Sequence, residues 1–385
     1  MLAVAIWVSR GTSGTTAATP PPSTASATMP PATVDSAMPP AYLAWMPGGF
    51  PASFASAVGS LPGVQAAVVV AGDTLWMTES RAADGKVVTH PAPPYRVPID
   101  AFAADPSLYA GFVPSAYRDT IETTLSKGQA VLGETSAKLR GFGVGGQLVF
   151  GSQSVTVGAV VPDPVVGWSE MLVSRSTGTK LGIVDNRYLL ATMSGNPSDS
   201  AFLREIQPSL TPGVPIRVAK PGEVQYVRVS SGSAPPVVLK DVFGEFAAYP
   251  DASDPGTIHI DPGWISTHLE TKSVPLLGSE TCNAALFPAL IGAMEQLQRE
   301  GLGDLVKSNA GCYNPKLLAS TATAPPSFHA YGAAIDINAP ENAFGATPTQ
   351  DKRLVAVMEH WGFNWGGRFL VPDGMHFEYL QPSAS

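Results

Sequence analysis

Two short segments near the C-terminal end of the chain alternate between apolar and polar side chains. Residues 333–338 read A-A-I-D-I-N, which puts two isoleucines on one face and Asp336 on the other. Residues 375–379 read M-H-F-E-Y and alternate in the same way, with His376 on the polar face. This pattern predicts two short strands. If they pair within one small sheet, Asp336 and His376 can meet across it.

A third polar side chain is expected to reach the same place from the loop before the first strand. His329 lies in that loop, and Gly332 allows the loop to turn tightly. Two neutral imidazoles and one carboxylate suit a zinc ion that keeps an open fourth position for water. We therefore expect a catalytic zinc site with His329, Asp336 and His376 as ligands. Asp373, which precedes His376 in D-G-M-H, is expected to act as the general base.

Four further side chains near these motifs have two open interpretations each. Glu378 either orients a metal ligand or is a solvated strand residue. Trp365, in a glycine-rich turn, either lines the substrate cleft or packs in the core. Ser327 and Tyr331 either contact substrate or stabilise the loop that carries His329. We interpret the other histidines as ordinary surface or loop residues: His90, His259, His268 and His360.

The motifs S-x-H-x-x-G-x-A-x-D and D-x-x-H-F-E, with G-F-N-W-G-G between them, resemble a known family. They are similar to the zinc D-alanyl-D-alanine carboxypeptidases and dipeptidases, and to the related L-alanyl-D-glutamate endopeptidases of cell-wall turnover (the VanY-like peptidases). The resemblance covers roughly residues 240–380. It implies the same ligands and base, peptidoglycan stem peptides as substrates, and an α+β fold in which helices flank a small antiparallel sheet.

Two positions depart from the pattern of this family. Lys316, in G-C-Y-N-P-K, stands where these enzymes often have arginine, and Phe369 stands where tryptophan is common. Lysine keeps the positive charge but loses the planar fork that holds a carboxylate in two hydrogen bonds. Lys316 is therefore expected to bind substrate, by stabilising the developing oxyanion or by holding a substrate carboxylate.

Two helices are predicted as the scaffold of this site. In T-P-T-Q-D-K-R-L, Thr347 is a suitable N-cap, proline follows at the first helical position, and Gln350 completes a capping box. Apolar residues then recur at helical spacing until Gly362, so we expect a helix over residues 348–361. A second amphipathic helix is expected over residues 286–297.

The two cysteines, Cys282 and Cys312, lie on either side of that second helix. In an oxidising compartment we expect them to form a disulfide, which would stabilise the fold by about 3 to 4 kcal/mol in the chain-entropy model. The alternatives are weaker, because a second zinc site would need more thiolates and a cysteine nucleophile would need a histidine at a recognisable spacing.

The N-terminal region is expected to lie outside the folded core. Residues 1–10 carry an apolar run that is too short to span a bilayer and lacks preceding basic residues. We interpret it as a truncated signal or anchor; the alternative is a misassigned start codon. Residues 11–40 are rich in Thr, Ala, Ser and Pro, with Asp35 as their only charged residue. This composition predicts a disordered tether that would hold the protein at a membrane.

Residues 41–235 carry no catalytic constellation, and we expect a mixed α/β domain of unknown role. Helical patterns occur at residues 51–61 and 117–125, and residues 146–161 alternate and break at Gly151, which predicts a hairpin. This region is similar to the extracytoplasmic domains of envelope permeases.

Length and charge limit the classes of function. A chain of 385 residues with 44% hydrophobic content can fill two cores. A linker is expected at residues 230–236, with the zinc peptidase domain over residues 242–382. The net charge of −8 and the lack of basic runs argue against a nucleic-acid partner.

Two classes of function remain. In the first, the chain is an extracytoplasmic zinc peptidase, secreted or membrane-anchored. By the resemblance, it hydrolyses an amide bond in peptidoglycan stem peptides, as a D-Ala-D-Ala carboxypeptidase or an L-Ala-D-Glu endopeptidase. In the second, the same cleft only binds wall peptides, and the chain is a catalytically weak or inactive module of an envelope complex. The presence of Asp373 favours the enzyme.

Overall fold

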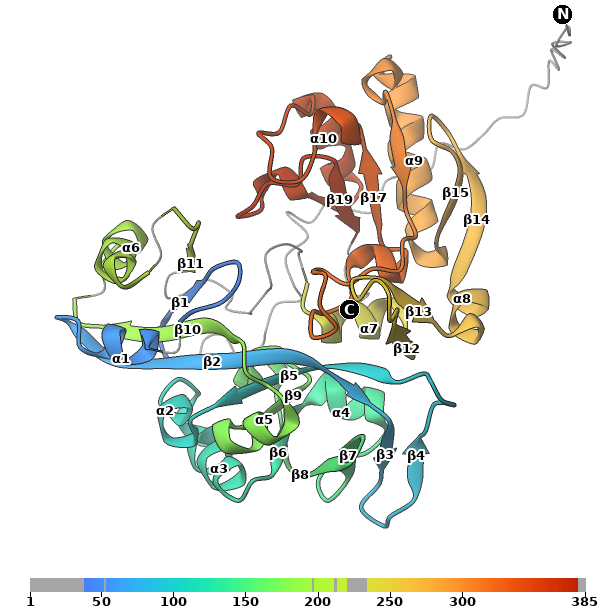
Figure 1. Ribbon diagram of the computed structural model, residues 1–385. Helices are drawn as coiled ribbons and strands as arrows, with labels where there is room; N and C mark the ends of the chain where they lie inside the picture. The colour runs from blue at the N-terminus through green and yellow to red at the C-terminus, as the bar shows by residue number, and fades with distance from the viewer. Residues whose placement is uncertain (1–37, 52, 196, 211–212, 220–233, 380–385) are drawn as a thin grey trace, which may run out of the picture.

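The computed structural model describes residues 38–379, apart from positions 52, 196, 211–212 and 220–233. A large sheet with its helices contains the N-terminal elements, and a smaller assembly of helices and short strands contains the C-terminal ones (Figure 1). The predicted α+β class is confirmed. The predicted signal or anchor lies outside the described residues, as do most of the tether and most of the linker.

The N-terminal elements form an 11-stranded sheet in the order β11-β1-β10-β2-β5-β9-β6-β8-β7-β3-β4. Neighbouring strands are antiparallel, except that β5 with β9 and β6 with β8 are parallel. The strands are β1 (Tyr42–Trp45), β2 (Val64–Met77), β3 (Glu79–Arg81), β4 (Val87–Thr89), β5 (Val97–Ala104), β6 (Ala130–Gly133), β7 (Gln147–Phe150), β8 (Gln153–Val161), β9 (Met171–Ser174), β10 (Asn186–Met193) and β11 (Arg217–Ala219).

Helices cover both faces of this sheet. In β2, Val68 and Val70 face a core shared with α2 and α3, whereas Val69 faces a core shared with α1 and α6. This alternation is expected for a strand that is buried on both sides. The helices are α1 (Phe54–Gly59), α2 (Pro106–Ala110), α3 (Ser115–Ser126), α4 (Glu134–Arg140), α5 (Arg175–Leu181) and α6 (Asp199–Ile206), with the 3-10 helices η2 (Asp163–Val166) and η3 (Gln207–Ser209).

The local predictions for this part are confirmed. Helix α3 covers the predicted helix at residues 117–125, and α1 lies within the one predicted at residues 51–61. Strands β7 and β8 form the predicted hairpin. Its turn contains Gly151, whose φ of 63° lies in the left-handed region that favours glycine.

A small antiparallel sheet forms the centre of the C-terminal part, in the order β16-β17-β19-β18. Its strands are β16 (Asn309–Gly311), β17 (Ala334–Ile337), β18 (Phe363–Trp365) and β19 (His376–Tyr379). Helices α9 (Phe287–Arg299) and α10 (Lys352–His360) flank it and contact each other (Figure 1). Gly292 permits this approach, because a Cβ there would lie 2.2 Å from the ring of Trp361.

The predicted start of the last helix is wrong. Helix α10 begins at Lys352 rather than at residue 348, and the Asp351 side chain caps its first turn. Gln350 does not cap a helix, because its side-chain amide donates to the carbonyl of Ile337 at 2.7 Å. Gln350 was assigned to the capping box by the sequence pattern, but its side chain binds the end of β17 instead.

In chain order, the remaining elements precede the small sheet or lie between its strands. They are α7 (Pro236–Phe243), β12 (Ala248–Pro250), β13 (Ile258–Ile260), α8 (Pro262–His268), β14 (Leu269–Val274) and β15 (Gly278–Asn283), with the 3-10 helices η4 (Ala284–Leu286), η5 (Gly303–Leu305), η6 (Phe328–Tyr331), η7 (Ala339–Glu341) and η8 (Gly366–Arg368). Val237 of α7 already belongs to the core around β17 and β19. This packing unit therefore starts before residue 242, and the division into domains stays a proposal.

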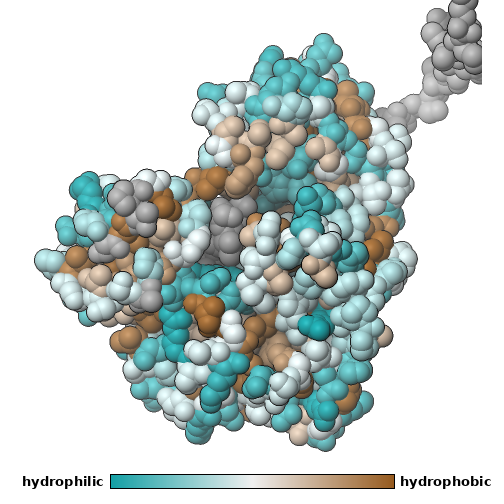
Figure 2. Space-filling view, viewed as in Figure 1, coloured by the Kyte–Doolittle hydropathy of each residue, from teal (hydrophilic) through white to brown (hydrophobic). Residues whose placement is uncertain are grey.

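The face seen in Figure 2 is hollowed between the part that carries α6 and the part that carries α10. Among the described residues, no helix combines the length and the apolar character that crossing a lipid bilayer requires.

Candidate metal centre

The register of one strand pair brings the first two candidate ligands together. Strands β17 and β19 are antiparallel neighbours, and Asp336 lies directly opposite His376. Side chains at opposite positions point to the same face of a sheet, so the Asp336 Oδ1 and His376 Nδ1 atoms lie 3.0 Å apart. The expected pairing of these two strands is thus observed.

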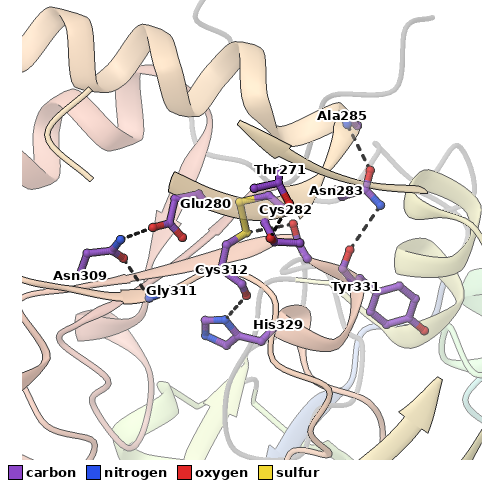
Figure 3. Close-up of a disulfide and its surroundings, with 12 residues drawn as sticks. Thr271, Glu280, Cys282, Asn283, Ala285, Asn309, Gly311, Cys312, His329 and Tyr331 are labelled. Atoms are coloured by element: carbon purple, nitrogen blue, oxygen red, sulfur yellow. Dashed lines mark hydrogen bonds between the residues drawn. A yellow bond between two sulfur atoms is a disulfide. The ribbon is translucent and has the colours of Figure 1, made fainter. Parts of the chain in front are cut away.

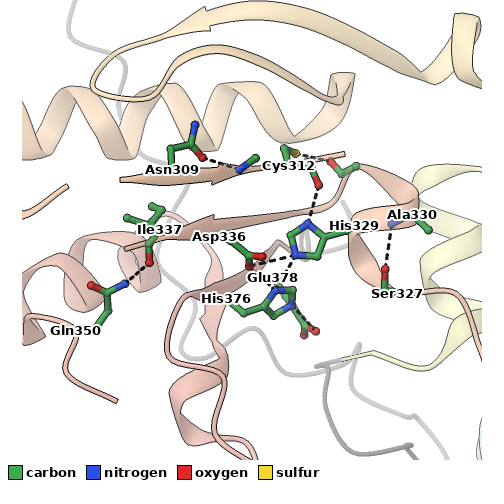
Figure 4. A network of polar contacts seen from close by, with 12 residues as sticks. Asn309, Cys312, Ser327, His329, Ala330, Asp336, Ile337, Gln350, His376 and Glu378 are labelled. Atoms are coloured by element: carbon green, nitrogen blue, oxygen red, sulfur yellow. Dashed lines mark hydrogen bonds and ion pairs between the residues drawn. The ribbon is translucent and has the colours of Figure 1, made fainter. Parts of the chain in front are cut away.

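The third candidate ligand comes from the 3-10 helix before β17. His329 lies in η6, and Gly332 ends this turn with a φ of 64°. The Nε2 atom of His329 lies 3.2 Å from Asp336 Oδ1 and 3.0 Å from His376 Nδ1 (Figure 4). Three side chains from two strands and one turn therefore converge on one point, and their donor atoms all lie within 4.8 Å of one another.

The spacing of these atoms fits a tetrahedral zinc site. Zinc binds nitrogen and oxygen ligands at about 2.0–2.2 Å, which places two tetrahedral ligands about 3.3–3.6 Å apart. The observed separations of 3.0–3.2 Å are slightly shorter than this. The side chains of His329, Asp336 and His376 are 14%, 18% and 10% exposed, so the donors are shielded from bulk water but remain accessible.

The hydrogen bonds behind the two imidazoles determine which nitrogens face each other. His329 Nδ1 donates to the carbonyl oxygen of Cys312 at 2.7 Å, and His376 Nε2 donates to Glu378 Oε1 at 3.2 Å. A carbonyl and a carboxylate only accept, so these nitrogens carry the protons. The lone pairs on His329 Nε2 and His376 Nδ1 then point at each other and at Asp336. Only a cation or a shared proton can occupy that point without repulsion.

The pKa shifts of His376 and Asp336 also favour a positive charge at this point. Burial alone would lower the pKa of His376, but the hydrogen bonds with Asp336 and Glu378 outweigh it and raise the pKa to about 10. Burial alone would raise the pKa of Asp336, whereas the hydrogen bonds with His329 and His376 bring it below the ordinary carboxyl range. The cluster thus holds a proton tightly wherever no metal competes for it.

Asp373 carries a buried carboxylate oxygen beside this cluster. Its Oδ1 atom has no hydrogen-bond partner among the described residues. Burial raises the pKa of Asp373, the charge of His376 opposes the rise, and the charge of Asp336 adds to it. A half-buried carboxylate with a raised pKa and an unused oxygen is suited to accept and return a proton.

The other predicted site residues differ in their placement. Tyr331 is fully buried and packs against Phe246 and Trp264, so it stabilises the core rather than facing substrate. The Ser327 hydroxyl accepts a hydrogen bond from the backbone N–H of Ala330 at 3.3 Å and caps η6. These two observations favour the loop-stabilising alternative for both residues.

Lys316 and Trp365 are more exposed than Ser327 and Tyr331. Lys316 is exposed, and its backbone carbonyl accepts from the backbone N–H of Ser327 at 2.9 Å, next to the turn that carries His329. Trp365 is half-buried, with its indole N–H donating to the carbonyl of Gly374 at 2.8 Å. Trp365 therefore packs on the backbone between Asp373 and β19.

Sequence reasoning missed two contributions to the site. The sequence pattern marks Phe369 only as a departure from the family, yet its ring centroid lies 6.2 Å from that of His376. The carbonyl of Cys312 orients His329, and no sequence signal marks a backbone carbonyl for such a role. The predicted disulfide between Cys282 and Cys312 is present (Figure 3).

Comparison with known families was consistent with this arrangement. Residues 320–379 match the family described as D-alanyl-D-alanine carboxypeptidase. The resemblance predicted from the sequence is confirmed over these residues. The matched segment contains His329, Asp336, Asp373 and His376, and it supports a peptidase in general terms.

Two solved structures show weaker likeness. The periplasmic region of MacB from Actinobacillus actinomycetemcomitans is similar at a TM-score of 0.33 with 11% identity, over 49% of this chain and 92% of that chain. The extracellular domain of the noncanonic ABC-type transporter YknZ from Gram-positive bacteria is similar at a TM-score of 0.28 with 14% identity, over 44% and 88%. Likeness at this level decides nothing about fold or role, so the similarity of residues 41–235 to permease domains stays a prediction. No curated protein matched the chain.

Proposed function

We propose that this chain is a zinc-dependent peptidase that hydrolyses an amide bond in peptidoglycan stem peptides. The bond is of the D-Ala-D-Ala carboxypeptidase or the L-Ala-D-Glu endopeptidase type. The convergence of three electron-pair donors, His329 Nε2, Asp336 Oδ1 and His376 Nδ1, is the observation that supports the proposal most directly. The match of the surrounding segment to the D-alanyl-D-alanine carboxypeptidase family supports the substrate class.

The donor set determines the chemistry that is proposed. Bound by these three side chains, zinc would acidify a water molecule and polarise the scissile carbonyl. Asp373 accepts the proton that the attacking water loses and delivers it to the leaving amine. Its unpaired, buried Oδ1 and its raised pKa support this role.

Three further residues are assigned supporting roles. Glu378 holds His376 in the tautomer whose Nδ1 binds metal, which its hydrogen bond at 3.2 Å supports. Lys316 is proposed to bind a substrate carboxylate or the developing oxyanion, and its exposure is compatible with that role. Trp365, next to the Asp373 segment, is proposed to line the substrate cleft.

The proposed location is extracytoplasmic, in the cell envelope. A disulfide between Cys282 and Cys312 is expected in an oxidising compartment, and peptidoglycan lies outside the cytoplasm. Attachment to a membrane through the N-terminal residues is part of this proposal. Recovery of the native protein in the cytosolic fraction would contradict it.

The decisive experiment measures zinc and hydrolysis in one preparation. The full chain is purified, its zinc content is measured, and the products of purified wall fragments are identified by mass spectrometry. We expect Asp373→Asn to lower kcat by about 10²–10⁴-fold while zinc stays bound, because a general base is lost and a ligand is not. The control is Asp304→Asn, which changes an exposed carboxylate on η5 and should leave both quantities unchanged.

The same experiment separates the rival function. A protein that carries zinc but hydrolyses no wall fragment would be a wall-peptide-binding module of an envelope complex instead. A protein that binds no zinc after exposure to the metal would contradict the proposed site itself.

A further inference from the structure

The turn that carries His329 is held on one side by the segment that follows β16. The carbonyl oxygen of Cys312 accepts from His329 Nδ1 at 2.7 Å (Figure 4). The backbone N–H of Asn314 donates to the carbonyl of His329 at 3.0 Å. The imidazole is therefore tied at its ring and at its backbone to the same short segment. The position of Cys312 sets the direction of His329 Nε2.

The end of β15 holds the same turn on its other side. The backbone N–H of Asn283 donates to the carbonyl of Gly332 at 2.9 Å, and the Asn283 side-chain amide donates to the carbonyl of Tyr331 at 3.3 Å (Figure 3). The packing is close, because a Cβ on Gly332 would lie 2.6 Å from the backbone nitrogen of Asn283. The turn is thus clamped between two segments that are distant in sequence.

The disulfide joins these two segments covalently. Cys282 directly precedes Asn283, and Cys312 supplies the carbonyl that holds His329. Both cysteines are fully or nearly fully buried, with exposures of 0% and 2%, and Cys312 Sγ lies 3.3 Å from the carbonyl oxygen of Gly332. The bond therefore lies against the turn it encloses rather than on a remote surface.

In the part of the chain that the structure describes, no strand pairing joins the end of β15 to the segment after β16 in place of the disulfide. Between the end of β16 at Gly311 and the start of η6 at Phe328, the described residues form only isolated bridges and turns. The backbone of this segment is tied to β15 through the N–H of Tyr313, which donates to the carbonyl of Thr281 at 3.0 Å, whereas its other backbone hydrogen bonds include those to His329, to residues 256–258 and within the segment. Because β15 and β16 belong to different sheets, no strand ladder joins the two sides of the clamp, and the disulfide is the covalent link between them.

We propose that the Cys282–Cys312 disulfide is a positioning element of the metal site, which fixes the Cys312 carbonyl on His329 and thereby aims His329 Nε2 at Asp336 and His376. This inference rests on the proposed zinc site. It assigns the disulfide a role in metal affinity in addition to any effect on folding. Groups behind metal ligands commonly change affinity by about 10–100-fold when they are lost.

The test compares zinc affinity in the full-length wild type and in the double variant Cys282→Ser with Cys312→Ser. We expect the zinc Kd of the variant, measured by chelator competition, to rise by about 10–100-fold. The visible spectrum of the cobalt-loaded variant should also change, because it reports the geometry of the ligands. A second variant, Cys282→Ala with Cys312→Val, refills the space of the sulfurs with apolar groups, and circular dichroism selects the variant that folds.

A matched control separates positioning from loss of stability. Leu297→Ala removes a buried side chain from α9, in the same core but away from the His329 turn, and lowers stability without touching the clamp. Its zinc Kd and cobalt spectrum should equal those of the wild type. If the folded cysteine variants bind zinc as tightly as the wild type, or if Leu297→Ala weakens zinc binding equally, the positioning role is wrong.

The readout also distinguishes this inference from the proposed function. A wild type that binds zinc but hydrolyses no wall peptide would contradict the peptidase proposal, whereas the affinities would still decide the role of the disulfide. A wild type that binds no zinc would overturn both.

Discussion

Two buried polar clusters in this molecule differ in how their charges meet. One is the metal cluster of His329, Asp336 and His376. The other, which we call the ion cluster, consists of Asp100, Arg140, Glu170, Arg187, Lys240 and Glu245. It lies where α7 packs against α4, between the large sheet and the C-terminal part (Figure 1).

In the ion cluster each cation meets at least one anion. Lys240 Nζ lies 2.8 Å from Glu170 Oε2 and 3.1 Å from Glu245 Oε1, and Arg140 forms an ion pair with Glu245. Arg187 pairs with Asp100 at 3.0 Å. Three positive and three negative side chains therefore compensate one another, and the cluster needs no further ion.

In the metal cluster the side chains converge instead of pairing. Two imidazole lone pairs and one carboxylate face a common point, and the protons of both rings are already used by Cys312 and Glu378. The comparison teaches that burial of polar groups alone does not mark a functional site. Donors that converge without a counter-charge indicate a bound cation, whereas complementary charges indicate structure.

The largest expected effect comes from removing one donor. His329→Ala should abolish zinc retention and hydrolysis, because two ligands remain where about three are needed. The unfolding free energy of the metal-free protein should fall by about 2 kcal/mol, since the hydrogen bonds with Cys312 and Asp336 are lost. Zinc content after dialysis and denaturant unfolding with a chelator measure the two quantities. If this variant kept one zinc per chain, His329 would not be needed as a ligand. The proposed difference between the metal cluster and the ion cluster would then be wrong.

The opposite result is expected in the ion cluster. Lys240→Ala removes the nearer cation from the buried Glu170 and leaves it only Arg140 at 3.8 Å, which should lower the unfolding free energy by about 3–5 kcal/mol. Zinc content of the folded protein should not change. Lys138→Ala is the matched control, because Lys138 also joins α4 to α7, through Asp241, but is 73% exposed. Its loss should be about 0–1 kcal/mol. Equal losses in the two variants would show that burial of the pair is unimportant.

The smallest expected effect is a difference in pH dependence between the clusters. In the metal-free protein the pKa of His376 is raised from 6.5 to about 10, so its stabilisation is complete below 6.5 and is lost as the pH rises to about 10. Burial lowers the pKa of Lys240 from 10.5 to about 8, against the attraction of Glu170. As the pH rises, the folded state therefore loses the Lys240 proton before the unfolded state does, so the free energy of unfolding rises between pH 8 and 10.5.

Two variants separate these opposing slopes, each of which is about 1.4 kcal/mol per pH unit. Between pH 8 and 10, His376→Gln should make the metal-free protein gain stability with pH relative to the wild type. Lys240→Met should make it lose stability relative to the wild type over the same range. Denaturant unfolding at several pH values measures both. Parallel curves for the wild type and both variants would contradict the assigned pKa shifts.

The site was predictable where the chemistry is local. The alternation around Asp336 and His376 predicted two strands, and their pairing in register follows from the small sheet. The failure at residues 347–350 has a physical cause, because the favourable capping pattern lost to a tertiary hydrogen bond between Gln350 and Ile337. Tyr331 could not be placed either, because a tyrosine beside a ligand suits a cleft and a core equally well.

The ion cluster was not predictable at all. Glu170 and Lys240 are 70 residues apart, and each looks like an ordinary surface charge in its own segment. Their burial depends on how α7 packs against the large sheet. That packing depends on the whole fold, so no local sequence pattern predicts it.

The sequence by itself determined which atoms are available for chemistry: two imidazoles, the carboxylates of Asp336 and Asp373, and two cysteines able to pair. Only the tertiary structure decided which nitrogen of each ring faces the metal, because the Cys312 carbonyl and the Glu378 carboxylate behind them hold the protons. Side-chain identity is encoded one residue at a time, whereas a direction in space depends on partners that folding brings together.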